Sequence, residues 1–144
     1  MKKIFSLMIC ALAVCTVITA QTMNIRVGQV TYQFPAEQTG VMNYTDGSTL
    51  SVMNKVFALT EVEEMYVDET TVVDNMVSVA YDESSAVVTV AGNVAQYLTI
   101  TTNGAHVNIT QSEDLAEEIT YTLSGSSSDG EFYMSGSYKA IVEL

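Results

Sequence analysis

Apolar and polar residues alternate with a period of two along most of this chain, and this pattern limits its fold more than any other feature. Met76–Tyr81 and Ala86–Val90 are two clear examples, both rich in β-branched residues. Successive side chains of a strand point to opposite faces, so the alternation predicts strands with one buried face. Segments with the spacing of an amphipathic helix are nearly absent. The sequence therefore predicts an all-β protein.

Turn residues separate the predicted strands. The apolar positions change parity at Gly28, which indicates a bulge or a tight turn. Pro35 should end the strand that follows, because proline has no N–H for a strand ladder. The four residues Asp82–Ser85 predict a hairpin between the two β-branched segments. Ala91–Asn93 marks another turn.

The pair Asn103-Gly104 predicts a type I′ hairpin turn, since both residues accept positive φ. This turn would place Thr101 opposite His106. One face of the hairpin would then be apolar and the other polar. The apolar face would carry Leu98, Ile100, Val107 and Ile109, and the polar face would carry Thr99, Thr101, His106 and Asn108.

We expect residues 21–111 to form a small antiparallel β-sandwich-like domain. Residues 112–118 are polar and acidic and indicate a connection. Strands are predicted at Ile119–Leu123, Glu131–Met134 and Tyr138–Leu144. The last of these has no closing turn, and an open strand favours association through its edge. We therefore expect the chain to be truncated relative to a longer protein.

The first 20 residues have the layout of a secretory signal peptide. Lys2 and Lys3 precede the apolar run Ile4–Ile18, and cleavage is expected after Ala20. A retained anchor is the alternative, but the run is short for a span of about 20 residues. We expect an exported protein, periplasmic, cell-surface or extracellular, with no membrane insertion after cleavage.

Cleavage would remove both cysteines and make the net charge of the chain more negative. Loss of Cys10 and Cys15 excludes disulfides, zinc-thiolate sites and cysteine nucleophiles. The formal charge would change from −12 to −14, because two basic residues and no acidic ones are removed. Such a charge repels phosphate backbones and argues against nucleic-acid binding. It suits cations, above all calcium, or it simply keeps the protein soluble.

Few residues suggest specific chemistry. Asp129 and Glu131 flank a glycine and are first of all turn residues, although they could also offer oxygen ligands to calcium. Tyr133 and Tyr138 are candidates for stacking on sugar rings, with sheet packing as the alternative. His106 is the only histidine, so no triad or zinc site can form around it, and it is expected to be an exposed strand residue. We predict a protein that is not an enzyme.

The segment 118–140, which contains Tyr-Thr-Leu-Ser-Gly at 121–125, is similar to the start of a carbohydrate-binding β-helix domain. That domain occurs in secreted proteins of anaerobic, gut-type bacteria. Residues 23–111 resemble the small β-rich region that precedes it. The resemblance implies that residues 112–144 are the incomplete start of a right-handed parallel β-helix. It also implies binding to plant cell-wall polysaccharides, with possible bound calcium.

Two functions follow as expectations. The first is an exported, non-catalytic polysaccharide-binding protein. The second is a structural or adhesive cell-surface module that does not bind sugar. The family's β-helix needs several stacked coils to bury its faces. Only about one coil precedes Leu144, so no binding residue of the family is carried over to this chain.

Overall fold

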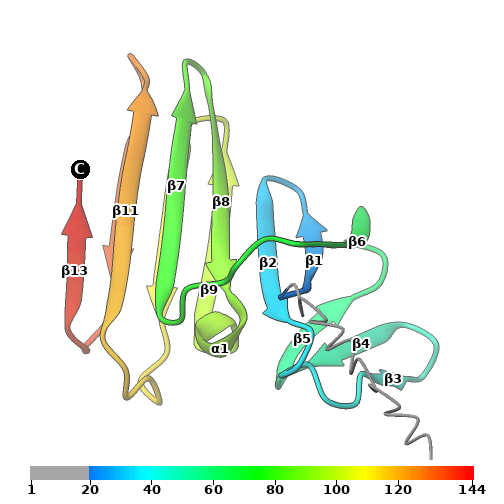
Figure 1. Ribbon diagram of the computed structural model, residues 1–144. Coiled ribbons are helices and arrows are strands. Elements are labelled where there is room, and N and C mark those ends of the chain that lie inside the picture. The colour runs from blue at the N-terminus through cyan, green and yellow to red at the C-terminus, as the bar shows by residue number, and fades with distance from the viewer. Residues whose placement is uncertain (1–19) are drawn as a thin grey trace, which may run out of the picture.

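The computed structural model describes residues 20–144 and confirms the predicted all-β character (Figure 1). This part of the chain contains thirteen strands and one helical turn. In chain order they are β1 (Thr22–Val27), β2 (Val30–Pro35), β3 (Asn43–Thr45), β4 (Thr49–Val52), β5 (Lys55–Ala58), β6 (Glu64–Asp68), β7 (Met76–Asp82), β8 (Ser85–Ala91), α1 (Gly92–Ala95), β9 (Leu98–Asn103), β10 (His106–Gln111), β11 (Ile119–Ser126), β12 (Glu131–Ser135) and β13 (Ala140–Glu143). The predicted signal peptide lies outside the described residues except for Ala20. Across residues 20–144, no helix is long and apolar enough to cross a membrane.

The strands form three sheets. The large sheet has the order β13-β11-β7-β8-β2-β1-β6, the small sheet has the order β12-β10-β9, and a third sheet has the order β3-β4-β5. Figure 1 shows the small sheet behind the β7–β11 part of the large sheet, with the third sheet beside β1 and β2. Two layers therefore face each other over the C-terminal half of the chain.

The large sheet is mixed, so the expectation that residues 21–111 form an antiparallel unit is correct only in part. β2 pairs with β8, β7 with β11, and β11 with β13 in parallel, and β10 pairs with β12 in parallel in the small sheet. Parallel neighbours require a crossover through another part of the fold. Turn residues predict only hairpins between strands that are consecutive in the chain. They cannot predict pairing between strands that are distant in the sequence.

The core lies between the sheets. The inward-facing side chains of β7, β8, β10 and β11 are fully buried there, including Val79, Val88, Ile109 and Tyr121. Two edge-on aromatic contacts join the large sheet to the third sheet, since Phe57 lies 5.1 Å from Tyr32 and 6.1 Å from Phe34 between ring centroids. A tilted contact of 5.7 Å between Tyr121 and Phe132 joins the large sheet to the small one.

Several predicted turns are confirmed. Gly28 has a φ of 57° at the tight turn between β1 and β2, and β2 ends at Pro35. The β7–β8 hairpin is present, although Asp82 pairs with Ser85 and the loop has two residues rather than four. The turn predicted at Ala91–Asn93 is instead the beginning of α1.

The predicted register of the β9–β10 hairpin is wrong by two residues. Asn103 pairs with His106, so the turn residues are Gly104 and Ala105. Gly104 has a φ of 60°, which suits a type II′ turn with glycine first. The Gly104 carbonyl accepts hydrogen bonds from the Ala86 N–H and from the Gln29 side chain, and these contacts favour this placement. A shift of two preserves parity, so the apolar and polar faces are as predicted.

Residues on both sides of position 112 share one sheet and one core. β11 pairs with β7 from Thr120 to Ser126, and Tyr121 in β11 is fully buried. The β7–β8 hairpin also contacts the end of β11, because the Glu83 N–H donates to the Ser126 carbonyl over 2.9 Å.

Candidate ligand-binding face of the small sheet

The outer face of the small sheet is a regular array of polar side chains. The register aligns them in three rows across β9, β10 and β12. The first row is Asn103, His106 and Glu131, the second is Thr101, Asn108 and Tyr133, and the third is Thr99, Thr110 and Ser135. Neighbouring strands lie about 4.8 Å apart and successive rows about 7 Å apart. We call these nine residues the outer polar face.

An open cavity of about 400 Å³ lies over the first two rows. Its walls include the side chains of Thr101, Asn108, Glu131 and Tyr133. Tyr133 is 55% exposed, so its ring is available to a ligand rather than packed in the core. An aromatic face beside amides and hydroxyls is the usual composition of a site that binds a small polar molecule.

His106 lies between two carboxylates. Its Nδ1 is 3.3 Å from Glu131 Oε2, and its Nε2 is 3.4 Å from Asp129 Oδ2. A neutral imidazole has one donor nitrogen, so both nitrogens donate only in the protonated ring. All three side chains are substantially exposed, so these pairs contribute little to stability. They place two carboxylates beside His106 at one end of the outer polar face.

Hydrogen bonds fix the loop that carries Asp129. The Asp129 N–H donates to Ser127 Oγ over 3.2 Å, and the Ser127 hydroxyl donates to the Glu83 carbonyl. The Tyr81 hydroxyl donates to the Glu131 carbonyl over 3.1 Å. Burial, and secondarily the charge of Glu131, raise the pKa of Tyr81, so this hydroxyl remains a donor into the alkaline range. The β7–β8 hairpin therefore supports the acidic end of the cavity.

The structure brings together three of the four residues singled out from the sequence. Glu131 and Tyr133 line the cavity together with His106, and Asp129 contacts His106 from outside the lining. Tyr138 lies in the β12–β13 connection and does not line the cavity. Thr101 and Asn108 were predicted on the polar face of the hairpin but not as part of a site. The missing information was the parallel pairing of β12 with β10, for which the sequence contains no local signal.

The arrangement favours hydrogen bonding over metal binding. Asp129 and Glu131 contact opposite nitrogens of one ring, so they converge on His106 and not on a shared ion position. Among residues 20–144, no group of three or more histidine, cysteine or acidic side chains is arranged to hold a metal ion. The face offers an exposed ring, amides and hydroxyls, which suit a ligand rich in hydroxyl groups.

Comparison with known protein families, curated proteins and solved structures finds no match for this chain.

Proposed function

We propose that this chain is an exported, non-catalytic polysaccharide-binding protein whose ligand lies on the outer polar face. The observation that carries the proposal is the exposed ring of Tyr133 within rows of amide and hydroxyl side chains. Sugar rings present apolar C–H faces and a rim of hydroxyl groups. An aromatic ring surrounded by hydrogen-bonding groups complements both features.

We also propose that β10–β13 form the first coil of a parallel β-helix. From β10 to β13 the chain alternates between the small and the large sheet. β12 pairs with β10 and β13 pairs with β11, both in parallel. Stacked coils would extend the outer polar face as a continuous surface, which suits a polymeric ligand better than a small molecule.

Affinity electrophoresis in native gels tests the function. The protein should migrate more slowly in a gel that contains at least one of two plant cell-wall polysaccharides, a neutral soluble cellulose derivative or pectin, than in a gel without polysaccharide. Tyr133→Ala should weaken retention about tenfold, because loss of a ring contact costs about 1–2 kcal/mol. Tyr138→Ala is the matched control, since Tyr138 is also exposed but lies outside the cavity. Unretarded migration in both polysaccharides would end the proposal, and so would equal effects of the two substitutions.

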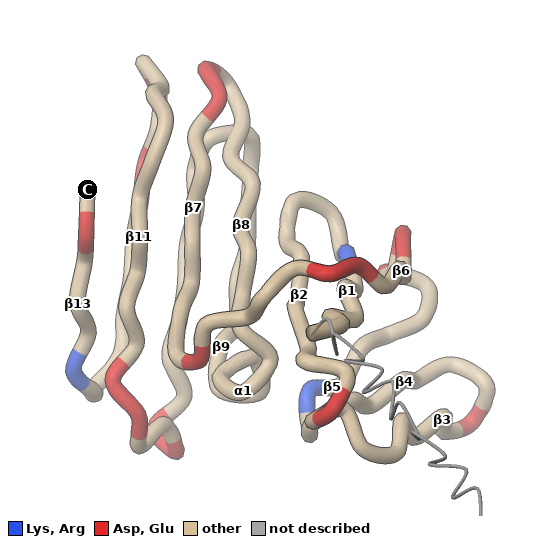
Figure 2. The backbone as a smooth tube through the Cα atoms, viewed as in Figure 1, with Lys and Arg blue, Asp and Glu red and all other residues tan. Residues whose placement is uncertain are grey.

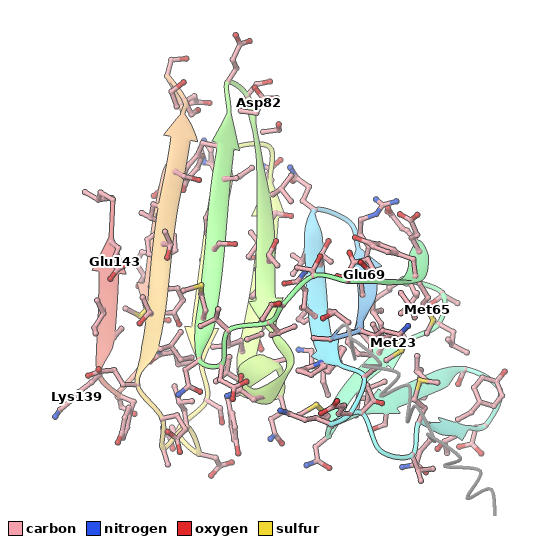
Figure 3. The ribbon with its side chains drawn as sticks, viewed as in Figure 1. Met23, Met65, Glu69, Asp82, Lys139 and Glu143 are labelled. Atoms are coloured by element: carbon pink, nitrogen blue, oxygen red, sulfur yellow. The ribbon has the colours of Figure 1, made fainter. Side chains whose placement is uncertain are left out.

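A structural or adhesive module is the second candidate, and the edges of the large sheet favour it. β6 forms one edge and β13 the other. Met65, Tyr66 and Val67 on β6 and Ile141 and Val142 on β13 are all at least 40% exposed. Figure 3 shows Met65 at one side of the molecule and Lys139 and Glu143 at the two ends of β13 on the other. Unpaired edges recruit strands, so sedimentation that depends on protein concentration would support this function.

A further inference from the structure

The charges around the cavity indicate which glycans it accepts. Asp129 and Glu131 stand on either side of His106 at one end of the outer polar face. Within the cavity, the only basic side chain is His106. A ligand on Tyr133 would lie one row away from the Glu131 carboxylate, at a separation of about 7 Å.

The one arginine and two lysines in the described part of the chain lie elsewhere. Arg26 binds Glu63 and Glu64, at 2.6 and 3.2 Å. The Lys55 ammonium donates to the Leu98 carbonyl over 2.9 Å and lies over the Tyr32 ring. Lys139 lies in the β12–β13 connection and does not line the cavity. No arginine or lysine is therefore placed to hold a carboxylated sugar on this face.

We infer that the ligand of this face, on the basis of the function proposed above, is an uncharged glycan chain, and that Asp129 and Glu131 exclude polymers of uronic acids. Glucan hydroxyls donate hydrogen bonds to carboxylate and amide oxygens without electrostatic cost. A uronate polymer places a negative charge on every sugar unit. Two such charges about 7 Å apart repel each other even in water, and the repulsion falls as salt rises.

The test measures the affinity of the full chain for two purified polymers, a neutral soluble cellulose derivative and polygalacturonate. Each affinity is measured at low and at high salt. Binding to the neutral polymer should exceed binding to polygalacturonate about tenfold or more at low salt, and the difference should shrink as salt rises. The double variant Asp129→Asn, Glu131→Gln should gain about tenfold affinity for polygalacturonate. The ratio of its affinity for the neutral polymer to its affinity for polygalacturonate should therefore fall.

A matched control distinguishes the effect of the charges beside the cavity from the effect of the net charge of the protein. Glu113→Gln, Asp114→Asn makes the same change in net charge on an exposed turn that does not line the cavity. It should leave the preference for the neutral polymer nearly intact. Stronger binding to polygalacturonate than to the neutral polymer by the unmodified protein would overturn this inference but leave the proposed function standing. Equal gains in the two double variants would also overturn it. Absence of binding to both polymers would instead refute the proposed function itself.

Discussion

Burial of the Tyr32 side chain makes the stability of the protein depend on pH in the alkaline range. Tyr32 is only 6% exposed and lies edge-on to Phe57, with the Lys55 ammonium 5.1 Å from its ring centroid. Burial, followed by the negative charge of Glu61, raises the pKa of Tyr32 to about 12. Burial also lowers the pKa of Lys55. The phenol proton of Tyr32 is therefore linked to folding at alkaline pH.

We predict that the protein loses stability as the pH rises from 10 to about 12. The unfolded chain releases the phenol proton near pH 10, whereas native Tyr32 holds it until about pH 12. Stability from the neutral phenol is therefore complete below pH 10 and is lost as the pH rises through 12. The loss should be about 2–3 kcal/mol. Tyr81 and Tyr121, whose pKa values are also raised by burial, act in the same direction.

Urea unfolding at several pH values measures this effect. Tyr32→Phe should lose less stability than the unmodified protein above pH 10, because phenylalanine has no proton to release. Tyr133→Phe makes the same chemical change at an exposed position and should behave like the unmodified protein. The lowered pKa of Lys55 makes stability rise with pH, but only below its ordinary value of 10.5, so the two effects occupy different pH ranges. An identical pH profile for Tyr32→Phe and the unmodified protein would contradict the account.

At the scale of elements, the close approach of β11 to β7 depends on glycine. Gly125 has a φ of 83° and pairs with Tyr81. A Cβ atom at Gly125 would lie 2.0 Å from the Tyr81 carbonyl oxygen. The two strands could accommodate a side chain there only by moving apart.

We predict that Gly125→Ala lowers the free energy of unfolding by more than about 3 kcal/mol, because strain at positive φ and a backbone collision add. Gly28→Ala is the matched control. It also has positive φ, but no atom lies within 4 Å of its added Cβ, so it should cost only about 1–2 kcal/mol. Denaturant unfolding compares the two variants. Equal losses would show that β11 does not approach β7 as closely as described.

Local signals were enough to predict the strands and several hairpins but not the order of strands. The alternation at Met76–Tyr81 and the glycine at position 28 each act within a few residues, and both predictions are confirmed. The parallel pairs of β2 with β8 and β7 with β11 join distant segments and depend on crossovers. The short helix α1 was also missed. A Cβ atom at Gly92 would lie 2.4 Å from a Phe34 ring carbon, so this position depends on tertiary packing.

At the scale of the whole molecule, acidic residues lie between positions 37 and 83 and between 113 and 143, and none lies in residues 84–112 (Figure 2). Their mutual repulsion opposes the association of copies through the exposed edges of β6 and β13. For the candidate site, too, the sequence predicted the residue types but not which of them lie together in space. Tyr133, Asp129 and Glu131 could be selected by residue type alone. Their assembly beside Thr101 and Asn108 required the pairing of β12 with β10.

The central claim is that the outer polar face binds a glycan, and chemical-shift mapping with a soluble neutral oligosaccharide tests it most directly. The account predicts changes in the amide signals of β9, β10 and β12, largest near Thr101, Asn108 and Tyr133. Signals of β3, β4, β5 and Tyr138 should stay unchanged. An unperturbed spectrum at saturating oligosaccharide, or changes centred on the third sheet, would contradict the account.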